Sequence, residues 1–241
     1  MFHSLVLLGT AILLEGCLYG DESCHSYGLV YQDHTTNGEV MQFVYNPDKT
    51  LEVVSDLNQA ETYFYYTRGG ELFRIEKNKG GVPETVWSLR SDAKGRVISR
   101  YKEDHAPGDS IVFEYDDKDR MIKASYYSNK SEIFFYYDIE YPDASTVKKA
   151  VYLRDQFTSA LNLSTIDIYE IDNYPLPYPQ GYYFSQDILE EVFLPHNVLS
   201  KRTTSPDGAT VGTVTTHTYT YNQRGYPKSQ DTVLQYVYGC I

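Results

Sequence analysis

The sequence is short of several residue types and patterns, and each shortage excludes a class of protein. It has 21 Lys and Arg against 33 Asp and Glu, a net charge of −12, which disfavours nucleic acid as a partner because phosphate binding needs surplus positive charge. No apolar run reaches the roughly 18 residues of a membrane-spanning helix. Three cysteines and six histidines are scattered without the paired spacing of a zinc site.

Motifs of common catalytic sites are also absent. The chain has no phosphate-binding glycine loop and no Gly-x-Ser-x-Gly nucleophile elbow. Residues 116–119 (DDKD) resemble part of a calcium loop, but they lack the Gly and distal Glu of an EF-hand and are better explained as a hairpin turn. We therefore expect neither an enzyme nor a cofactor, and the sequence identifies no substrate.

The first segment has the character of an export signal. Residues 5–14 (LVLLGTAILL) form an apolar run that is too short for a membrane span and typical of a signal-peptide core. The alternative is an ordinary buried helix or strand. The run leads to Leu14-Glu15-Gly16-Cys17, which resembles the lipobox of bacterial lipoproteins. This resemblance implies a signal peptide over residues 1–16, lipidation of Cys17, a tether over 17–26 and an outer-membrane anchor that faces the surface or the periplasm.

Two cysteines remain if Cys17 carries lipid. Exported compartments permit disulfides, and Cys24 and Cys240 then have one possible pairing. The sequence therefore favours a Cys24–Cys240 disulfide that links the two ends of the domain. The alternative is a pair of partly buried free thiols.

A seven-residue pattern recurs along the chain, and its first four copies begin at residues 45, 66, 91 and 115. Each copy has an aromatic or polar strand end, a polar residue that can hydrogen-bond its own backbone, a tight turn and an apolar residue that restarts a strand. Gly at the fifth position of three copies suits a positive φ. The five copies are Tyr45-Asn-Pro-Asp-Lys-Thr-Leu51, Tyr66-Thr-Arg-Gly-Gly-Glu-Leu72, Ser91-Asp-Ala-Lys-Gly-Arg-Val97, Tyr115-Asp-Asp-Lys-Asp-Arg-Met121 and Tyr221-Asn-Gln-Arg-Gly-Tyr-Pro227.

Between these turns the side chains alternate with the period of a β-strand. Ile111, Phe113 and Tyr115 fall on one face, and Val112 and Glu114 on the other. The pattern predicts an all-β fold, an antiparallel meander of a dozen or more strands, in a single domain over residues 27–241. No segment within residues 25–153 has the pattern of an amphipathic helix.

Residues 154–196 depart from this pattern and predict an excursion from the sheet. Residues 173–181 (NYPLPYPQG) hold three closely spaced prolines, which a central strand does not tolerate. Residues 185–194 (SQDILEEVFL) predict the single short helix, with Ser185 as its N-cap and Pro195 after its end.

The turns resemble the YD-repeat of RHS-type proteins, whose unit reads Tyr-Asp-x-x-Gly-Arg-Leu, and residues 115–121 form the most similar copy. The whole layout is similar to Bacteroidetes lipoproteins of uncharacterised function that are described as having a porin-like fold. The similarity rests on the lipobox, the turns, residues 199–201 (LSK), residues 219–222 (YTYN) and residues 225–227 (GYP). It implies one large curved sheet or a barrel-like shape and no established activity. The predicted strands are mostly shorter than transmembrane strands and carry charges, so we expect no pore.

Aromatic side chains are the most conspicuous feature that remains, with 25 Tyr and 10 Phe. We expect Tyr63, Tyr65, Trp87 and Tyr136 to lie near each other on the concave side of the sheet and to form a stacking platform for a glycan. The alternative is cross-strand packing that only stabilises the sheet. We expect a lipid-anchored binding or scaffold module, with a glycan or an envelope protein as partner. The first alternative is a glycan-binding surface lipoprotein of a polysaccharide-utilisation system, and the second is a glycan-active enzyme.

Two tripeptides resemble the Asp-Ser/Thr-apolar sites of O-glycosylation in Bacteroidetes. They are Asp109-Ser110-Ile111 and Asp231-Thr232-Val233. The resemblance implies Ser110 and Thr232 as glycosylation sites, and the alternative is ordinary strand sequence.

Overall fold

The computed structural model describes residues 27–241 apart from residues 37, 59, 104–109, 129–131 and 187–192. This part of the chain forms 17 strands and one short helix. In chain order they are β1 (Tyr27–His34), β2 (Glu39–Tyr45), β3 (Leu51–Asp56), β4 (Ala60–Tyr66), β5 (Leu72–Lys79), β6 (Val82–Ser91), β7 (Val97–Lys102), β8 (Ser110–Tyr115), β9 (Met121–Tyr127), β10 (Ile133–Glu140), β11 (Thr146–Arg154), β12 (Leu161–Ile171), α1 (Gln180–Tyr183), β13 (Val198–Thr204), β14 (Thr210–Thr216), β15 (Tyr219–Tyr221), β16 (Pro227–Gln230) and β17 (Leu234–Cys240).

The strands form one antiparallel sheet. From β1 to β14 each strand pairs with the next strand along the chain. β15 pairs with β16, β16 pairs with β17, and β17 returns to β1. No ladder joins β14 to β15 in the described part of the chain, so the curved sheet stays open at this seam. The predicted meander of a dozen or more strands in one curved sheet is confirmed.

The recurring turns share one backbone geometry. The fifth residue of every copy has a positive φ, whether it is Lys49 (75°), Asp119 (62°) or one of the glycines. In each turn the N–H of the fifth residue donates to the carbonyl of the second, as at Gly95 and Asp92 (3.0 Å). The pattern therefore specified the turns correctly even where Gly is replaced.

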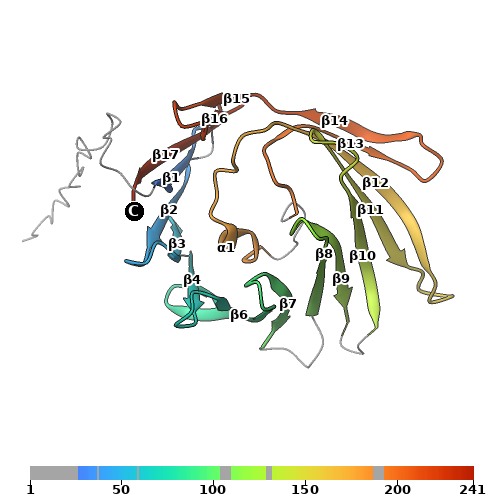
Figure 1. Cartoon of the computed structure of the whole chain (residues 1–241), viewed down its shortest axis with the longest axis horizontal. Coiled ribbons are helices and arrows are strands. Elements are labelled where there is room, and N and C mark those ends of the chain that lie inside the picture. Colours follow the sequence, from blue (N-terminus) through green and yellow to red (C-terminus); the bar gives the residue numbers. More distant parts are fainter. Residues whose placement is uncertain (1–26, 37, 59, 104–109, 129–131, 187–192) are drawn as a thin grey trace, which may run out of the picture.

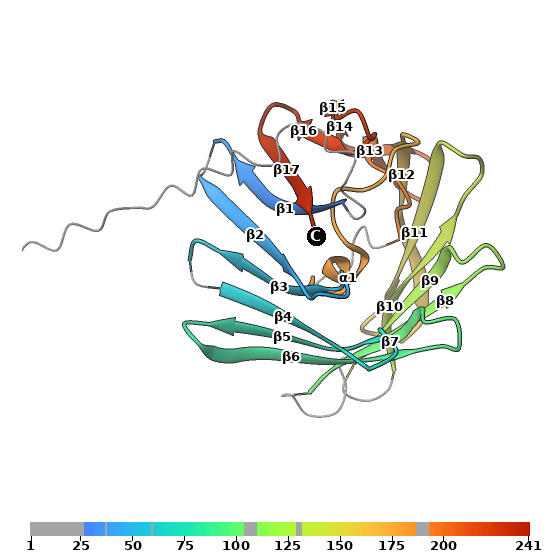
Figure 2. The same cartoon turned by 60° about the vertical axis from the view of Figure 1, so that its left-hand side comes forward.

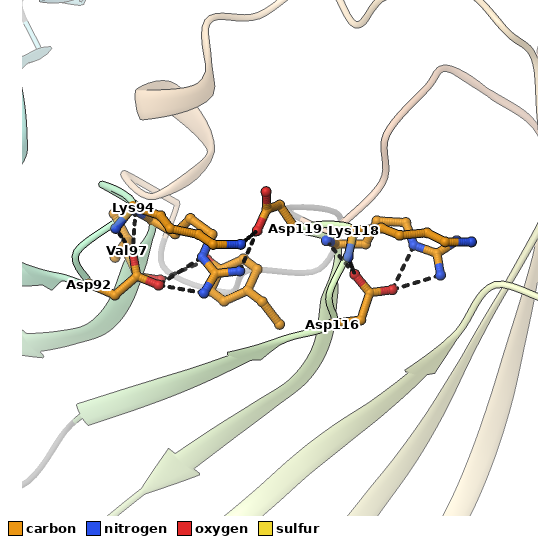
Figure 3. Close-up of polar contacts among 9 residues, drawn as sticks. Asp92, Lys94, Val97, Asp116, Lys118 and Asp119 are labelled. Carbon is orange, nitrogen blue, oxygen red and sulfur yellow. Dashed lines mark hydrogen bonds and ion pairs between the residues drawn. The ribbon is translucent and has the colours of Figure 1, made fainter.

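Side chains brace two of these turns, as Figure 3 shows. Asp92 Oδ1 accepts the backbone N–H groups of Lys94 and Arg96 at 2.9 and 3.0 Å, while its Oδ2 accepts the Arg96 guanidinium. Asp116 repeats both interactions with Lys118 and Arg120. Each hairpin therefore carries an internal hydrogen-bond network that needs no distant residue.

Tyrosines at strand ends connect neighbouring hairpins. The hydroxyls of Tyr45, Tyr115 and Tyr141 donate to the carbonyls of Leu29, Val97 and Met121 at 2.8, 2.7 and 2.8 Å. Ser91 occupies the tyrosine position of its turn, and its buried hydroxyl has no partner in the described part of the chain. In two copies of the repeat, those that begin at Tyr45 and Tyr115, the first residue thus links neighbouring hairpins through a hydroxyl to a main-chain carbonyl.

We expect the hydroxyls of two of these tyrosines to ionise at a higher pH than that of free tyrosine. Burial raises the pKa of both Tyr45 and Tyr115 from 10.0 to about 12. Because the folded-state pKa lies above the unfolded value, this contribution to stability is complete below pH 10 and is lost as the pH rises toward 12.

Tyr115→Phe should lower the free energy of unfolding by about 1 kcal/mol, since the Val97 carbonyl loses its donor. Tyr101→Phe, an exposed tyrosine on β7, is the matched control. The hydrogen bond to Val97 would be contradicted if the two variants were equally stable in urea. The raised pKa would be contradicted if tyrosinate absorbance of Tyr115 appeared at the ordinary pKa of 10.0.

The concave face of the sheet holds the core and is filled by one segment of the chain. Residues 172–186 and 193–197, which we call the interior segment, run inside the curve, and the first of these stretches includes α1 (Figures 1 and 2). Phe184 packs edge-on against Phe113 of β8 with ring centroids 5.6 Å apart, and Tyr182 packs similarly against Phe43 of β2. The interior segment therefore supplies the second layer of the core.

One boundary prediction is wrong. The predicted excursion over 154–196 is too long, because residues 161–171 form β12, which pairs with both β11 and β13. The single short helix of the described residues is α1 at Gln180–Tyr183. Ser185, the N-cap of the helix predicted over 185–194, follows α1 in a turn, where its hydroxyl donates to the Tyr182 carbonyl at 2.7 Å. Residues 187–192 lie outside the described part of the chain. Proline at position 179 pre-organises the first turn of the helix, a signal that was available in the sequence.

Candidate functional site

A pocket of about 510 Å³ lies over the inner face of β6 to β10. We call it the aromatic pocket, because half of its lining is aromatic. Arg100 and Lys102 add positive charge, and Ser110 adds a hydroxyl. Its aromatic lining residues are Trp87, Tyr126, Tyr127, Phe134 and Phe135.

The register of four strands builds one wall of this pocket. Arg100 pairs with Ile111, Ile111 with Tyr126, and Tyr126 with Phe135, across β7, β8, β9 and β10. Directly paired residues share a face of the sheet, so this row points together into the concave side. The rings of Tyr126 and Phe135 stack with centroids 3.9 Å apart at 22°. The wall is thus a rigid stacked surface rather than a set of independent side chains.

Arg100 joins this wall to the interior segment. It is only 3% exposed, and its guanidinium donates to the carbonyls of Phe184 and Gln186 at 2.7 and 2.6 Å. The same group lies 5.0 Å from the centre of the Trp87 ring, within cation–π range. The geometry of the pocket therefore depends on the position of the interior segment.

The predicted stacking platform does not form. Trp87 pairs with Ile75 on the core face and is 4% exposed. Tyr63 and Tyr65 flank the buried Phe64, so they point to the convex face, where the Tyr63 hydroxyl donates to Glu61 at 2.7 Å.

Tyr136 lies on the convex face of a distant strand and does not meet the other three residues. It stacks on Tyr152 of β11 with centroids 4.4 Å apart. A shift of one residue reverses the face of every side chain, and repeat spacing alone does not determine that parity. Of the four residues, only Trp87 belongs to the aromatic pocket. The alternation of Ile111, Phe113 and Tyr126 about known turns was the signal that could have located it.

The other predicted sites lie apart from one another. Ser110 begins β8 at the edge of the aromatic pocket, and Thr232 is exposed in the turn between β16 and β17. Cys17 and Cys24 lie outside the described residues. Cys240 ends β17, where it is the register partner of Tyr27.

Comparisons with known proteins identify the fold only. No family model matches the sequence, and no curated protein does. A porin-like protein from Bacteroides uniformis has a similar structure, with a TM-score of 0.58 and 13% identity over 88% of this chain and 96% of that one. A protein of unknown function from Bacteroides fragilis has a TM-score of 0.32 and 12% identity, over 66% of this chain and 94% of that one. The first similarity agrees with the fold that the sequence resemblance implied.

The aromatic pocket is lined by aromatic, aliphatic, basic and hydroxyl side chains. None of its described lining residues is Asp, Glu, His or Cys. Across the described residues, no group of three or more such side chains is placed to hold a metal ion. The helix α1, the one helix of the described residues, is not long and apolar enough to cross a membrane. The arrangement can stack on a ring, exclude water and offer cationic donors.

Proposed function

We propose that this protein is a binding module of the bacterial cell envelope that holds a ring-bearing ligand, with a glycan as the favoured class, in the aromatic pocket. The observation that carries this proposal is the stacked Tyr126–Phe135 wall beside Trp87 and two basic side chains. Aromatic faces bind the apolar faces of sugar rings, while lysine and arginine donate to hydroxyl or carboxylate oxygens. The described lining residues include no Asp, Glu, His or Cys, and we therefore favour binding over catalysis.

A glycan array followed by calorimetry tests this proposal. Phe134 lines the pocket and is 58% exposed, so Phe134→Ala should leave the fold intact. Loss of one stacking ring should weaken binding about tenfold, equivalent to roughly 1.4 kcal/mol. Phe157→Ala is the matched control, since Phe157 is 86% exposed and lies outside the pocket. Unchanged affinity in Phe134→Ala, or no ligand among neutral and acidic glycans, would reject the proposal.

We also propose export and lipid anchoring through Cys17, which would place the protein at the outer membrane. The apolar segment 5–14 before Gly16-Cys17 supports this proposal, and the porin-like description of the Bacteroides uniformis neighbour is consistent with an envelope location.

The Cys24–Cys240 disulfide remains a prediction, now with a geometric argument. Tyr27 lies opposite Cys240, and Cys24 is three residues before Tyr27, a distance of at most about 10 Å of extended chain. Disulfide-bonded cysteines need Cα atoms about 4.4–6.8 Å apart, so this reach suffices.

The intact mass of the native, unreduced protein should show a lipidated chain that starts at Cys17 and lacks two thiol hydrogens. A chain that retains Met1, or one that alkylates at both cysteines without reductant, would contradict these predictions. If the bond forms, its removal by Cys240→Ser should cost up to roughly 5 kcal/mol, because the closed loop spans nearly the whole domain.

A further inference from the structure

Lys102 brings to the aromatic pocket a charge that has no partner in the described part of the chain. It is the last residue of β7, and its register partner on β6 is Trp87, which is buried on the core face. Directly paired residues share a face of the sheet, so Lys102 lies on the concave side, where it lines the pocket. No hydrogen bond or ion pair joins its ammonium group to any residue that the structure describes.

The two other basic side chains around Trp87 are already engaged. Arg100 donates to two main-chain carbonyls of the interior segment, and its guanidinium lies 5.0 Å from the centre of the Trp87 ring. Lys77 Nζ lies 5.1 Å from the centre of the same ring. Three basic side chains therefore surround one indole, and Lys102 is the one whose described surroundings leave its ammonium group to a ligand.

The carboxylate next to Lys102 in sequence serves the opposite face of the sheet. Glu103 accepts hydrogen bonds from the Arg74 guanidinium, at 2.9 Å, and from the Ser88 hydroxyl. These two partners flank core residues of β5 and β6, so they point to the convex side.

No described lining residue of the aromatic pocket is Asp or Glu, although the chain has 33 acidic and 21 basic residues. Salt screens charges beyond about 8 Å at physiological ionic strength, so the acidic surface elsewhere does little to oppose an anion at Lys102. A lysine ammonium group has three donors and no acceptor, and it binds most strongly to an anionic oxygen. The charge of the pocket therefore favours a ligand with an acidic group.

The size and walls of the pocket suit a ring. Its volume of about 510 Å³ lies within the range of roughly 300–1,000 Å³ that small-molecule sites have. The stacked rings of Tyr126 and Phe135 form one wall, and Phe134 beside them is 58% exposed. A sugar ring can place its apolar face on such a wall while its polar rim reaches the ammonium group.

We infer that the aromatic pocket selects an acidic sugar residue, whose ring stacks on the aromatic wall and whose carboxylate or sulfate group binds Lys102. The inference rests on the proposed function and names the ligand class of the same pocket. Lysine acts as a compact point charge and does not require the planar geometry that a bidentate arginine pair needs. Carboxylate and sulfate therefore share the chemistry that Lys102 recognises, and the test separates them.

Calorimetry with matched sugars tests the inference. The ligands are methyl α-glucoside, methyl α-glucuronide and a sulfate ester of methyl α-glucoside, together with the same three derivatives of galactose. At least one acidic sugar should bind about tenfold more tightly than its neutral parent, because a hydrogen bond to a charged group is stronger than one to a neutral group. Raising the salt concentration should reduce this preference, since salt screens the charge of a half-exposed lysine.

Lys102→Gln should abolish the preference by lowering the affinity for the acidic sugar about tenfold, whereas Lys102→Arg should retain it. Lys228→Gln is the matched control, because it removes the same charge from an exposed position on β16 that lies outside the pocket. Urea unfolding of each variant verifies that the fold is intact.

Phe134→Ala separates this inference from the proposed function, since loss of a ring should weaken neutral and acidic sugars alike. If neutral and acidic sugars bound equally and both were weakened in Phe134→Ala, the proposed function would stand and the acidic selectivity would be wrong. An acidic preference that Lys102→Gln retains would also overturn the inference. So would binding of phenylacetate, a ring-bearing carboxylate, without binding of any acidic sugar. Binding of no sugar of either kind would reject both proposals.

Discussion

Lys149→Met should lower the free energy of unfolding by about 3 kcal/mol, since it removes one member of a buried ion pair. Lys149 Nζ lies 2.9 Å from Asp167 Oδ2, with side-chain exposures of 4% and 10%. The ammonium also lies 4.8 Å from the centre of the Tyr137 ring and 5.8 Å from that of Phe193 of the interior segment. Without it, Asp167 retains Thr203 at 2.7 Å and the more distant Lys201 at 3.8 Å.

The loss should depend on pH in a defined direction. Burial would raise the pKa of Asp167, but its hydrogen bond and attraction to Lys149 hold it below the usual value of 3.8. In the wild type this contribution is complete above that value and is lost as the pH falls through the lowered folded-state pKa. In Lys149→Met the Asp167 pKa rises, so the variant tolerates acid better. The stability difference in urea should therefore be smaller at pH 4 than at pH 7.

Lys123→Met is a matched control on the convex face. Lys123 also has an aspartate partner, Asp138 at 3.8 Å, and a ring partner, Tyr136 at 4.6 Å, but its side chain is 33% exposed. Its loss should cost less than about 1 kcal/mol. The double variant Lys149→Met/Asp167→Leu should recover much of the loss, because no unpaired charge stays buried. If both lysine substitutions lowered the free energy of unfolding equally, the buried Lys149–Asp167 pair would contribute no more to stability than an exposed ion pair does.

Arg100→Met should cost about 3 kcal/mol and loosen the interior segment. Its guanidinium donates to the carbonyls of Phe184 and Gln186 directly after α1, and hydrogen bonds to charged groups contribute roughly 1.5–3 kcal/mol each. The interior segment fills the concave face, so its release should also open the aromatic pocket. We expect a lower urea midpoint, faster proteolysis within residues 172–186 and loss of any glycan binding.

Arg74→Met provides the control for Arg100. Arg74 also makes two polar contacts, with Glu76 at 3.3 Å and Glu103 at 2.9 Å, but its side chain is 34% exposed. Its loss should cost less than about 1 kcal/mol and leave proteolysis unchanged. Arg100→Lys should lie between wild type and Arg100→Met, because lysine keeps the charge without the planar fork. If Arg100→Met were as resistant to proteolysis as Arg74→Met, the interior segment would be held by its aromatic packing alone.

The turns and their strands could be predicted because their interactions lie within a few residues of sequence. An Asx side chain bonds backbone groups two and four residues on, as Asp92 does with Lys94 and Arg96, and the fifth residue adopts a positive φ. Such bonds are complete inside one hairpin, and they recur wherever the pattern recurs. The alternation of apolar and polar side chains between the turns then predicts the all-β fold and the antiparallel order from the sequence alone.

The faces of the strands and the course of the interior segment were decided only by tertiary structure. Trp87 faces the core while Tyr63 and Tyr65 face outward, because pairing register and bulges set the parity of each strand. The Lys149–Asp167 pair joins two strands, and the bond from Arg100 to the Phe184 carbonyl joins residues 84 positions apart in sequence. No local sequence pattern identifies these partners. They pair because a charged or polar group that is buried on the concave face has no water to bond and must find a partner within the protein.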